Sequence, residues 1–197
     1  INAKRLINDS EIDKVIYGFY NDTYLFDQNA CTSPHLIIWV GSNPEVEKAK
    51  EIFWNRLHIL VKEKYKIEPV IVIDKITDFY SQVIKMNEVV LEKSKDNLII
   101  RVRLKNLTNK IDQFSSVAGY FSEYTASSIT EISKIINKRY QTLSYYGYSK
   151  EEMKKYFLQL KPFGIDRIAP IGRTMEFSMV WDGYDMINCL SRSINII

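Results

Sequence analysis

The stretch LIIWVGSNPE, residues 36–45, joins a run of apolar residues to a helix-start signal. A short apolar run bounded by turn residues predicts a buried strand over 36–40. Ser42 is suited to an N-cap, Pro44 to the first helical turn and Glu45 to the acidic end of a capping box. A helix is therefore predicted from here to about residue 64. Its inward stripe, close to the 3.6-residue period, is Val46, Ala49, Ile52, Phe53, Leu57, Leu60 and Val61.

Strand and helix patterns alternate along the rest of the chain. Residues 70–73 fit either a strand or the lead into a helix over 77–86, whose inward side chains are expected to be Phe79, Val83 and Ile84. Further helices are predicted to begin near residues 10–11, 127–128 and 149, and further strands over 97–104, 117–124, 141–146 and 164–170. This alternation predicts an α/β fold, with a mostly parallel sheet covered by helices.

Composition excludes several classes of function. A net charge of +3 is too weak to indicate nucleic-acid binding. The two cysteines, Cys31 and Cys189, suggest no disulfide framework, so a reducing cytoplasm is expected. No signal peptide and no apolar stretch long enough to span a membrane is apparent. Because the sequence opens on Ile1 in what resembles mid-domain sequence, we expect a fragment of a longer protein.

Cys31 is the main candidate for catalysis, because it lies among small polar residues just before the predicted strand. A thiolate there is suited to nucleophilic attack; the alternative is a small residue at a helix-to-strand junction. His35 is either the base of a Cys–His pair or, as we favour, a polar residue at the strand edge. Asn29 is either a donor to a developing oxyanion or a helix C-cap, and the two roles are compatible. His58 is expected on a helix face.

The glycines are spread singly, without a G-x-G-x-x-G or Walker pattern, so a nucleotide would be bound mainly outside this chain. No paired Cys and His spacing indicates a zinc site. Residues 175–185 (MEFSMVWDGYD) either line a pocket or hold the C-terminal segment on the core, with a turn at 181–184. Cys189 is expected to be structural, and residues 193–197 to form an edge strand that pairs with another subunit.

Four blocks of sequence resemble one family when taken together. They are residues 27–36 (DQNACTSPHL), 141–147 (QTLSYYG), 164–172 (GIDRIAPIG) and 181–185 (WDGYD). The set resembles the LuxC-type acyl-CoA reductases, which form the fatty aldehyde of bacterial luminescence and are similar in fold to the aldehyde dehydrogenase superfamily. The resemblance implies a three-layer αβα catalytic domain over residues 1–197, with the nucleotide-binding domain absent from this chain.

The resemblance also implies a mechanism. The Cys31 thiolate takes an acyl group from a fatty acyl-CoA or from a partner acyl-protein synthetase, and NADPH reduces the acyl-cysteine to the aldehyde. The backbone N–H of Cys31 is one oxyanion donor. The superfamily's asparagine donor and glutamate base have no counterpart here, and its acid-Phe-Gly-Pro cofactor motif is not recognisable. A cytoplasmic enzyme that forms a homo-oligomer is expected, with the fragment alone inactive.

Two alternatives remain open. One is a cysteine-dependent acyltransferase or thioesterase, in which another thiol or water receives the acyl group. The other is a non-catalytic interaction fragment that retains the fold. The sequence gives neither the length of the acyl chain nor the pathway that uses the aldehyde.

Overall fold

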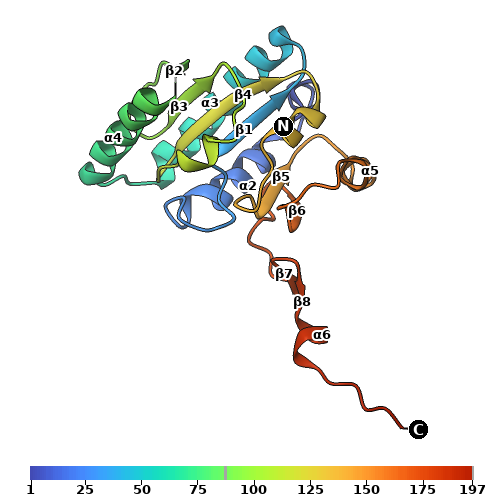
Figure 1. Ribbon diagram of the computed structural model, residues 1–197. Coiled ribbons are helices and arrows are strands. Elements are labelled where there is room, and N and C mark those ends of the chain that lie inside the picture. The colour runs from blue at the N-terminus through green and yellow to red at the C-terminus, as the bar shows by residue number, and fades with distance from the viewer. Residues whose placement is uncertain (87, 197) are drawn as a thin grey trace.

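A central sheet organises the molecule in the computed structural model, which describes residues 1–86 and 88–196. Its strands lie in the order β1 (Leu36–Val40), β4 (Tyr120–Ala126), β3 (Ile100–Leu104) and β2 (Val89–Leu91), as Figure 1 shows. Strands β1 and β3 run parallel to β4, and the edge strand β2 runs antiparallel to β3. The strand predicted over 117–124 is β4, which begins three residues later than expected.

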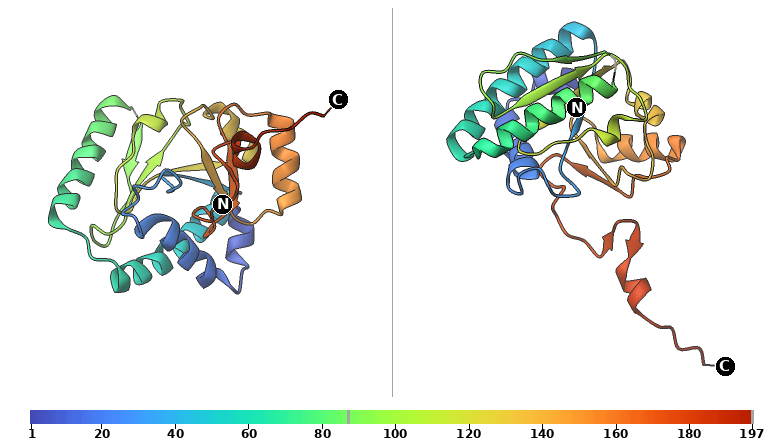
Figure 2. Two further views of the ribbon diagram at one scale, coloured as in Figure 1. Left: turned by 90° about the horizontal axis from the view of Figure 1, so that it is seen from below. Right: turned by 60° about the vertical axis from the view of Figure 1, so that its left-hand side comes forward.

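Helices cover both faces of this sheet. On one face, α1 (Ala3–Ile7), α2 (Ile12–Tyr24) and α3 (Asn43–Lys64) pack against alternate side chains of β1 and β4, including the fully buried Trp39 and Phe121. On the other face lie α4 (Pro69–Lys85) and the 3₁₀ segments η1 (Ile111–Gln113) and η2 (Ile129–Lys134). Figure 2 shows α4 on the opposite side of the sheet from α2 and α3. The predicted α/β class with a mostly parallel sheet is confirmed.

Local capping signals were predicted well. The capping box of Ser42 and Glu45 starts α3, and a second box of Ser149 and Glu152 starts α5 (Lys150–Leu160). Asp182 and Gly183 both have positive φ and form the tight turn of a small hairpin. The hairpin consists of β7 (Val180–Trp181) and β8 (Tyr184–Asp185). Strands β5 (Thr142–Tyr145) and β6 (Arg167–Pro170) form a separate parallel pair beside the main sheet.

Helix α4 is the main departure from expectation. Residues 70–73 are helical, and the helix begins at Pro69 rather than near residue 77. Phe79 packs inward as predicted, but Val83 and Ile84 are exposed, while Lys75 and Gln82 are fully buried. The polar face of α4 meets the sheet because Lys75 donates to the carbonyls of Asn97 and Ala118, just before β3 and β4. The Gln82 amide bonds the hydroxyls of Tyr120 and Ser122 on β4.

The expected helix after Ser128 is a 3₁₀ helix. Ser128 is its N-cap, and its isoleucines at positions 129 and 132, with Ile135 just beyond, repeat every three residues. That spacing aligns side chains on one side of a 3₁₀ helix, whose turn contains three residues. The apolar pattern was therefore recognised, but its period was assigned to the wrong helix type.

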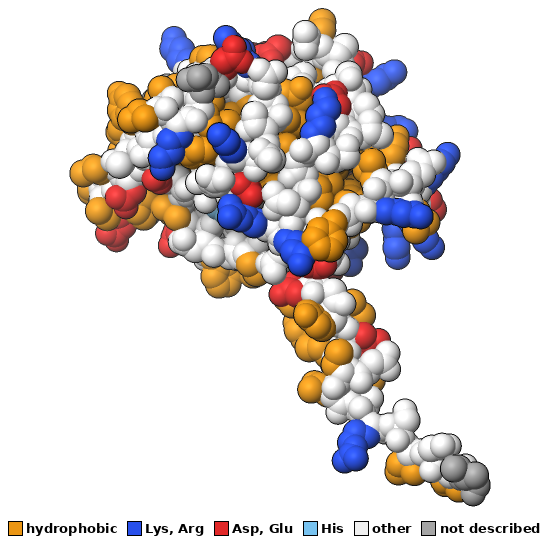
Figure 3. Space-filling model, viewed as in Figure 1, with side chains coloured by type: hydrophobic (Ala, Val, Ile, Leu, Met, Phe, Trp, Pro, Cys, Tyr) orange, Lys and Arg blue, Asp and Glu red, His pale blue; other side chains and the backbone are white. Residues whose placement is uncertain are grey.

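The C-terminal segment, residues 175–196, projects away from the sheet (Figure 1). It contains the β7–β8 hairpin, the short helix α6 (Met186–Leu190) and an extended end. Figure 3 shows hydrophobic side chains along this segment and over α4. The strongly exposed apolar residues of the segment are Phe177, Met179, Val180, Tyr184, Ile187, Leu190, Ile194 and Ile196. Among the described residues, no helix is both long and apolar enough to cross a membrane.

Candidate active site around Cys31

Cys31 lies in the loop of residues 25–35, between the end of α2 and the start of β1. Its thiol is free and exposed, and the residue lines a cavity of about 360 Å³. The sulfur is therefore open to a reagent arriving from solvent. Among the described residues, no backbone carbonyl or side chain accepts a hydrogen bond from the Cys31 N–H. This N–H is free to donate to another group.

A buried glutamine holds the Cys31 loop in place. The Gln28 side-chain N–H₂ donates to the carbonyls of Pro34 and Tyr120, at 2.7 and 2.9 Å. Its Oε1 accepts from the backbone N–H groups of Gly119 and Tyr120, at 2.8 and 3.0 Å. Gln28 is 1% exposed. Its amide thus uses four bonds to fasten the loop to the first residues of β4 on one side and to the entry of β1 on the other.

The backbone is bent on both sides of this attachment. Asp27 and Gln28 have φ values of 50° and 62°, and across from them Ala118 and Gly119 have values of 51° and 88°. The Ala118 N–H donates to the Asp27 carbonyl at 2.9 Å. A Cβ at position 119 would overlap both the Tyr24 hydroxyl and the Leu98 carbonyl, so only glycine fits this approach.

The residues after Cys31 are anchored as well. The Ser33 hydroxyl donates to the Asp22 carbonyl at 3.0 Å, and the Thr32 hydroxyl to the Met175 sulfur at 3.0 Å. The Asp22 carboxylate accepts from the Gly172 N–H at 2.6 Å, which brings the segment after β6 beside the loop. Burial raises the pKa of Asp22, although the bonds from Gly172 and Thr174 partly oppose this.

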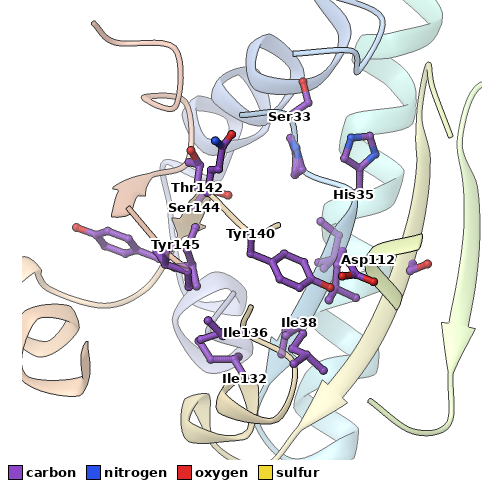
Figure 4. A pocket seen from close by; sticks show the side chains of 18 of the residues that line it. Ser33, His35, Ile38, Asp112, Ile132, Ile136, Tyr140, Thr142, Ser144 and Tyr145 are labelled. Carbon is purple, nitrogen blue, oxygen red and sulfur yellow. The ribbon is translucent and has the colours of Figure 1, made fainter. Parts of the chain in front are cut away.

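The cavity lies between the main sheet, η1, η2 and the β5–β6 pair (Figure 4). Residues 31–35 form one part of its wall, and β1 continues that wall through Leu36, Ile38 and Val40. The opposite wall is mostly apolar and is formed by Ile132, Ile135, Ile136, Leu143, Tyr145 and Tyr148. A thiol at the edge of a mainly apolar cavity is suited to react with a molecule whose apolar part enters the cavity.

His35 and Cys31 line the same cavity, but no hydrogen bond joins them in the described part of the chain. The His35 Nδ1 is buried and has no partner. Burial lowers the pKa of His35, and a backbone hydrogen bond with Ser116 only partly opposes this, so the ring is neutral. Within the described residues the structure therefore shows no hydrogen-bonded pair of Cys31 and His35. His58 pairs instead with Asp96, at 2.7 Å.

Asn29 is exposed, and its amide donates to the Asp27 carbonyl at 3.3 Å. It does not line the cavity of Cys31. The C-cap of α2 is Leu25 rather than Asn29. The role of Asn29 as a donor to a developing oxyanion stays a prediction.

The sequence analysis missed Gln28, Asp112 and Tyr140. Asp112 and Tyr140 line the cavity, and each has a buried polar atom without a partner. Gln28 stands three residues before Cys31, which was a weak signal.

Residues 175–185, by contrast, do not line this cavity. Their aromatic rings pack locally: Phe177 stacks on Trp181, over which the Arg167 guanidinium lies at 4.3 Å. Among residues 1–86 and 88–196, no group of three or more His, Cys, Asp or Glu is placed to hold a metal ion.

Comparison with known proteins gives limited similarity. No protein-family model matches the chain. No curated protein sequence matches it. Among solved structures, the crystal structure of an NAD-dependent benzaldehyde dehydrogenase from Corynebacterium glutamicum is similar with a TM-score of 0.46 and 14% sequence identity. The match covers 84% of this chain and 38% of the dehydrogenase, so the chain spans well under half of that protein. The resemblance to LuxC-type reductases rests on the sequence blocks alone.

Proposed function

We propose that this chain is the acyl-accepting catalytic domain of a fatty acyl-CoA reductase, with Cys31 as its nucleophile. The observation that carries the proposal is the exposed Cys31 thiol at the edge of a mainly apolar cavity. The four sequence blocks that resemble LuxC-type reductases support the same reading. In this proposal the substrate is a fatty acyl-CoA or an acyl group on a partner acyl-protein synthetase, and a nicotinamide dinucleotide, NADPH, supplies the hydride.

The first half of the reaction is acyl transfer. The Cys31 thiolate attacks the thioester carbonyl, and its sulfur forms a new bond to the carbonyl carbon. The bond from that carbon to the CoA sulfur then breaks, and CoA leaves as a thiolate that takes up a proton from water. The free N–H of Cys31 is suited to donate to the oxyanion that develops between these two events. Gln28 keeps the loop, and with it this N–H, in one position.

The sequence of this chain contains no glycine-rich phosphate loop. The glycines stand singly, so no glycine-rich loop is available to hold a pyrophosphate. The walls of the Cys31 cavity are mainly apolar, which does not suit a charged dinucleotide. We derive no hydride step from this chain, and in the proposal the cofactor is bound by residues outside it.

The two cysteines allow a matched test of acyl transfer. The full-length protein is incubated with a long-chain acyl-CoA, and the acyl-enzyme is measured by intact-protein mass spectrometry. Cys31→Ala is expected to abolish the added mass. Cys189→Ala is the control, because Cys189 is also exposed but lies on the projecting C-terminal segment, outside the cavity. Undiminished acylation of the Cys31→Ala protein would remove Cys31 from the mechanism.

A cysteine acyltransferase or thioesterase is the second candidate, favoured by the absence of a glycine-rich phosphate loop from this sequence. Both candidates form the same acyl-cysteine and differ in its fate. Parallel measurement of NADPH oxidation and CoA release by the full-length protein separates them. Oxidation in step with release supports the reductase, whereas release without oxidation supports transfer to water or another thiol.

A further inference from the structure

One end of the Cys31 cavity contains polar atoms that the fold leaves without partners. They are the His35 Nδ1, the Asp112 Oδ1 and the Tyr140 hydroxyl, all buried and all on residues that line the cavity. In Figure 4 the Tyr140 hydroxyl points toward Asp112, with His35 above them. Buried polar groups normally have hydrogen-bond partners, so three such atoms in one cavity need an explanation.

Asp112 already contributes to the fold through its other oxygen. Its Oδ2 accepts from the Asn137 amide at 3.0 Å and lies 3.6 Å from the Arg139 guanidinium. The side chain is only 6% exposed and lines the cavity, and its buried Oδ1 has no donor among the described residues. The carboxylate is therefore held in place on one side and available as an acceptor on the other.

Tyr140 complements this acceptor. Burial raises the pKa of Tyr140, and the nearby Asp112 raises it further, so the phenol remains protonated. Its ring packs against the buried cluster formed by Met86, Leu104, Ile111 and Ile135. A neutral O–H donor and a carboxylate acceptor thus face the same hollow. An occupant that both donates and accepts a hydrogen bond would satisfy the two groups at once.

Apolar side chains, Ile38, Ile132 and Ile136 among them, project into the cavity beside these groups (Figure 4), and polar residues such as Thr142 and Ser144 line another part of its wall. An unsubstituted acyl chain would suit the apolar part of that wall. It would leave the buried polar atoms of Asp112 and Tyr140 without hydrogen-bond partners, which is unfavourable for each of them. A chain with a hydroxyl group avoids this cost, because one hydroxyl donates to Asp112 and accepts from Tyr140.

We propose that this cavity selects acyl chains that carry a hydroxyl group, bound by Asp112 and Tyr140. This inference rests on the proposed function, in which Cys31 accepts the acyl group. It adds a substrate class to that function: the preferred thioester is a hydroxyacyl-CoA rather than a plain fatty acyl-CoA.

The test compares acyl-CoAs of one chain length that are unsubstituted, hydroxylated at C3 or hydroxylated at the chain end. The rate constant for formation of acyl-Cys31 in the full-length protein is measured by quenched mass spectrometry. At least one hydroxylated chain is expected to react about tenfold faster than the unsubstituted one. Tyr140→Phe removes a hydroxyl that has no partner in the protein, so the variant should fold, and it should bring the rates together.

Tyr148→Phe is the matched control. Tyr148 lines the same cavity, but its hydroxyl is not among the buried atoms that lack a partner in the described residues, so its removal should leave the preference intact. Equal rates for all three chains, or a preference for the unsubstituted chain, would overturn the proposed specificity and leave the role of Cys31 in place. Failure of every thioester to acylate Cys31 would overturn the proposed function itself.

Discussion

Replacing Gln28 with methionine removes all four hydrogen bonds of its amide and keeps a side chain of similar length and volume. All four bonds are between 2.7 and 3.0 Å and connect the Cys31 loop to β4 and to the entry of β1. At about 1 kcal/mol net for each buried bond, the free energy of unfolding should fall by about 4 kcal/mol. The loop would then be free to move relative to β4.

The effect on Cys31 should depend on which reaction is measured. Acyl transfer needs the sulfur and its N–H to be positioned together, and a displacement of about 1 Å can cost about a hundredfold in rate. Alkylation by iodoacetamide needs only an accessible thiol. In a Cys189→Ala background, at a temperature where circular dichroism shows the protein folded, Gln28→Met should slow acylation at least tenfold. Alkylation of Cys31 should change little.

Gln82→Met provides the matched control. Gln82 is also fully buried, and its amide bonds the hydroxyls of Ser122 and Tyr120 at 3.2 and 2.6 Å. It lies on α4 and not in the Cys31 loop. This variant should lose about 2 kcal/mol of stability by the same accounting and keep the acylation rate. A folded Gln28→Met protein that acylates as fast as Gln82→Met would refute the positioning role of Gln28.

Two further predictions concern stability. Burial raises the pKa of Glu123 above its ordinary value of 4.5, so its contribution to stability is greatest at acid pH and is lost as pH rises through the raised pKa. Glu123→Gln removes this titration, so the free energy of unfolding of the variant, measured with urea, should rise relative to that of the wild type as pH rises. Parallel pH profiles of the two free energies would contradict this prediction. Gly119→Ala should lower the free energy of unfolding by roughly 2–4 kcal/mol, because position 119 has a positive φ and the new Cβ would overlap Tyr24 and the Leu98 carbonyl. A variant whose thermal unfolding temperature is as high as that of the wild type would contradict this prediction.

Short-range patterns carried most of the fold that could be predicted. The strand of residues 36–40 and the capping boxes at Ser42 and Ser149 depend on neighbours within a few positions, and all three were found in the structure. The exposed position of Cys31 before its strand also followed from local composition. These features need only the periodicity of side chains and the hydrogen bonds of one turn.

Helix α4 shows what periodicity leaves open. Its sequence has an apolar stripe, and an apolar stripe normally faces the core. Here Lys75 and Gln82, seven residues apart, share the face that meets the sheet. Lys75 donates to the carbonyls of Asn97 and Ala118, at 2.7 and 2.8 Å, and burial lowers its pKa to about 7. The choice of face depended on carbonyls just before β3 and β4 and on hydroxyls of β4, which the sequence of α4 does not contain.

The same reasoning explains why the candidate site was only half predictable. Cys31 is a candidate nucleophile by its chemistry alone, since a thiol among small polar residues can be noticed without knowledge of distant contacts. The loop of Cys31 is held by contacts over a long separation, since Gln28 bonds Gly119 and Tyr120. In the core, Glu123 accepts from the indole groups of Trp39 and Trp54 in the same way. A buried polar side chain costs free energy unless a partner is present, so each of them constrains which strands lie together. In this molecule the apolar pattern selects the class of fold, and a few buried polar side chains place the loop of Cys31 against β4.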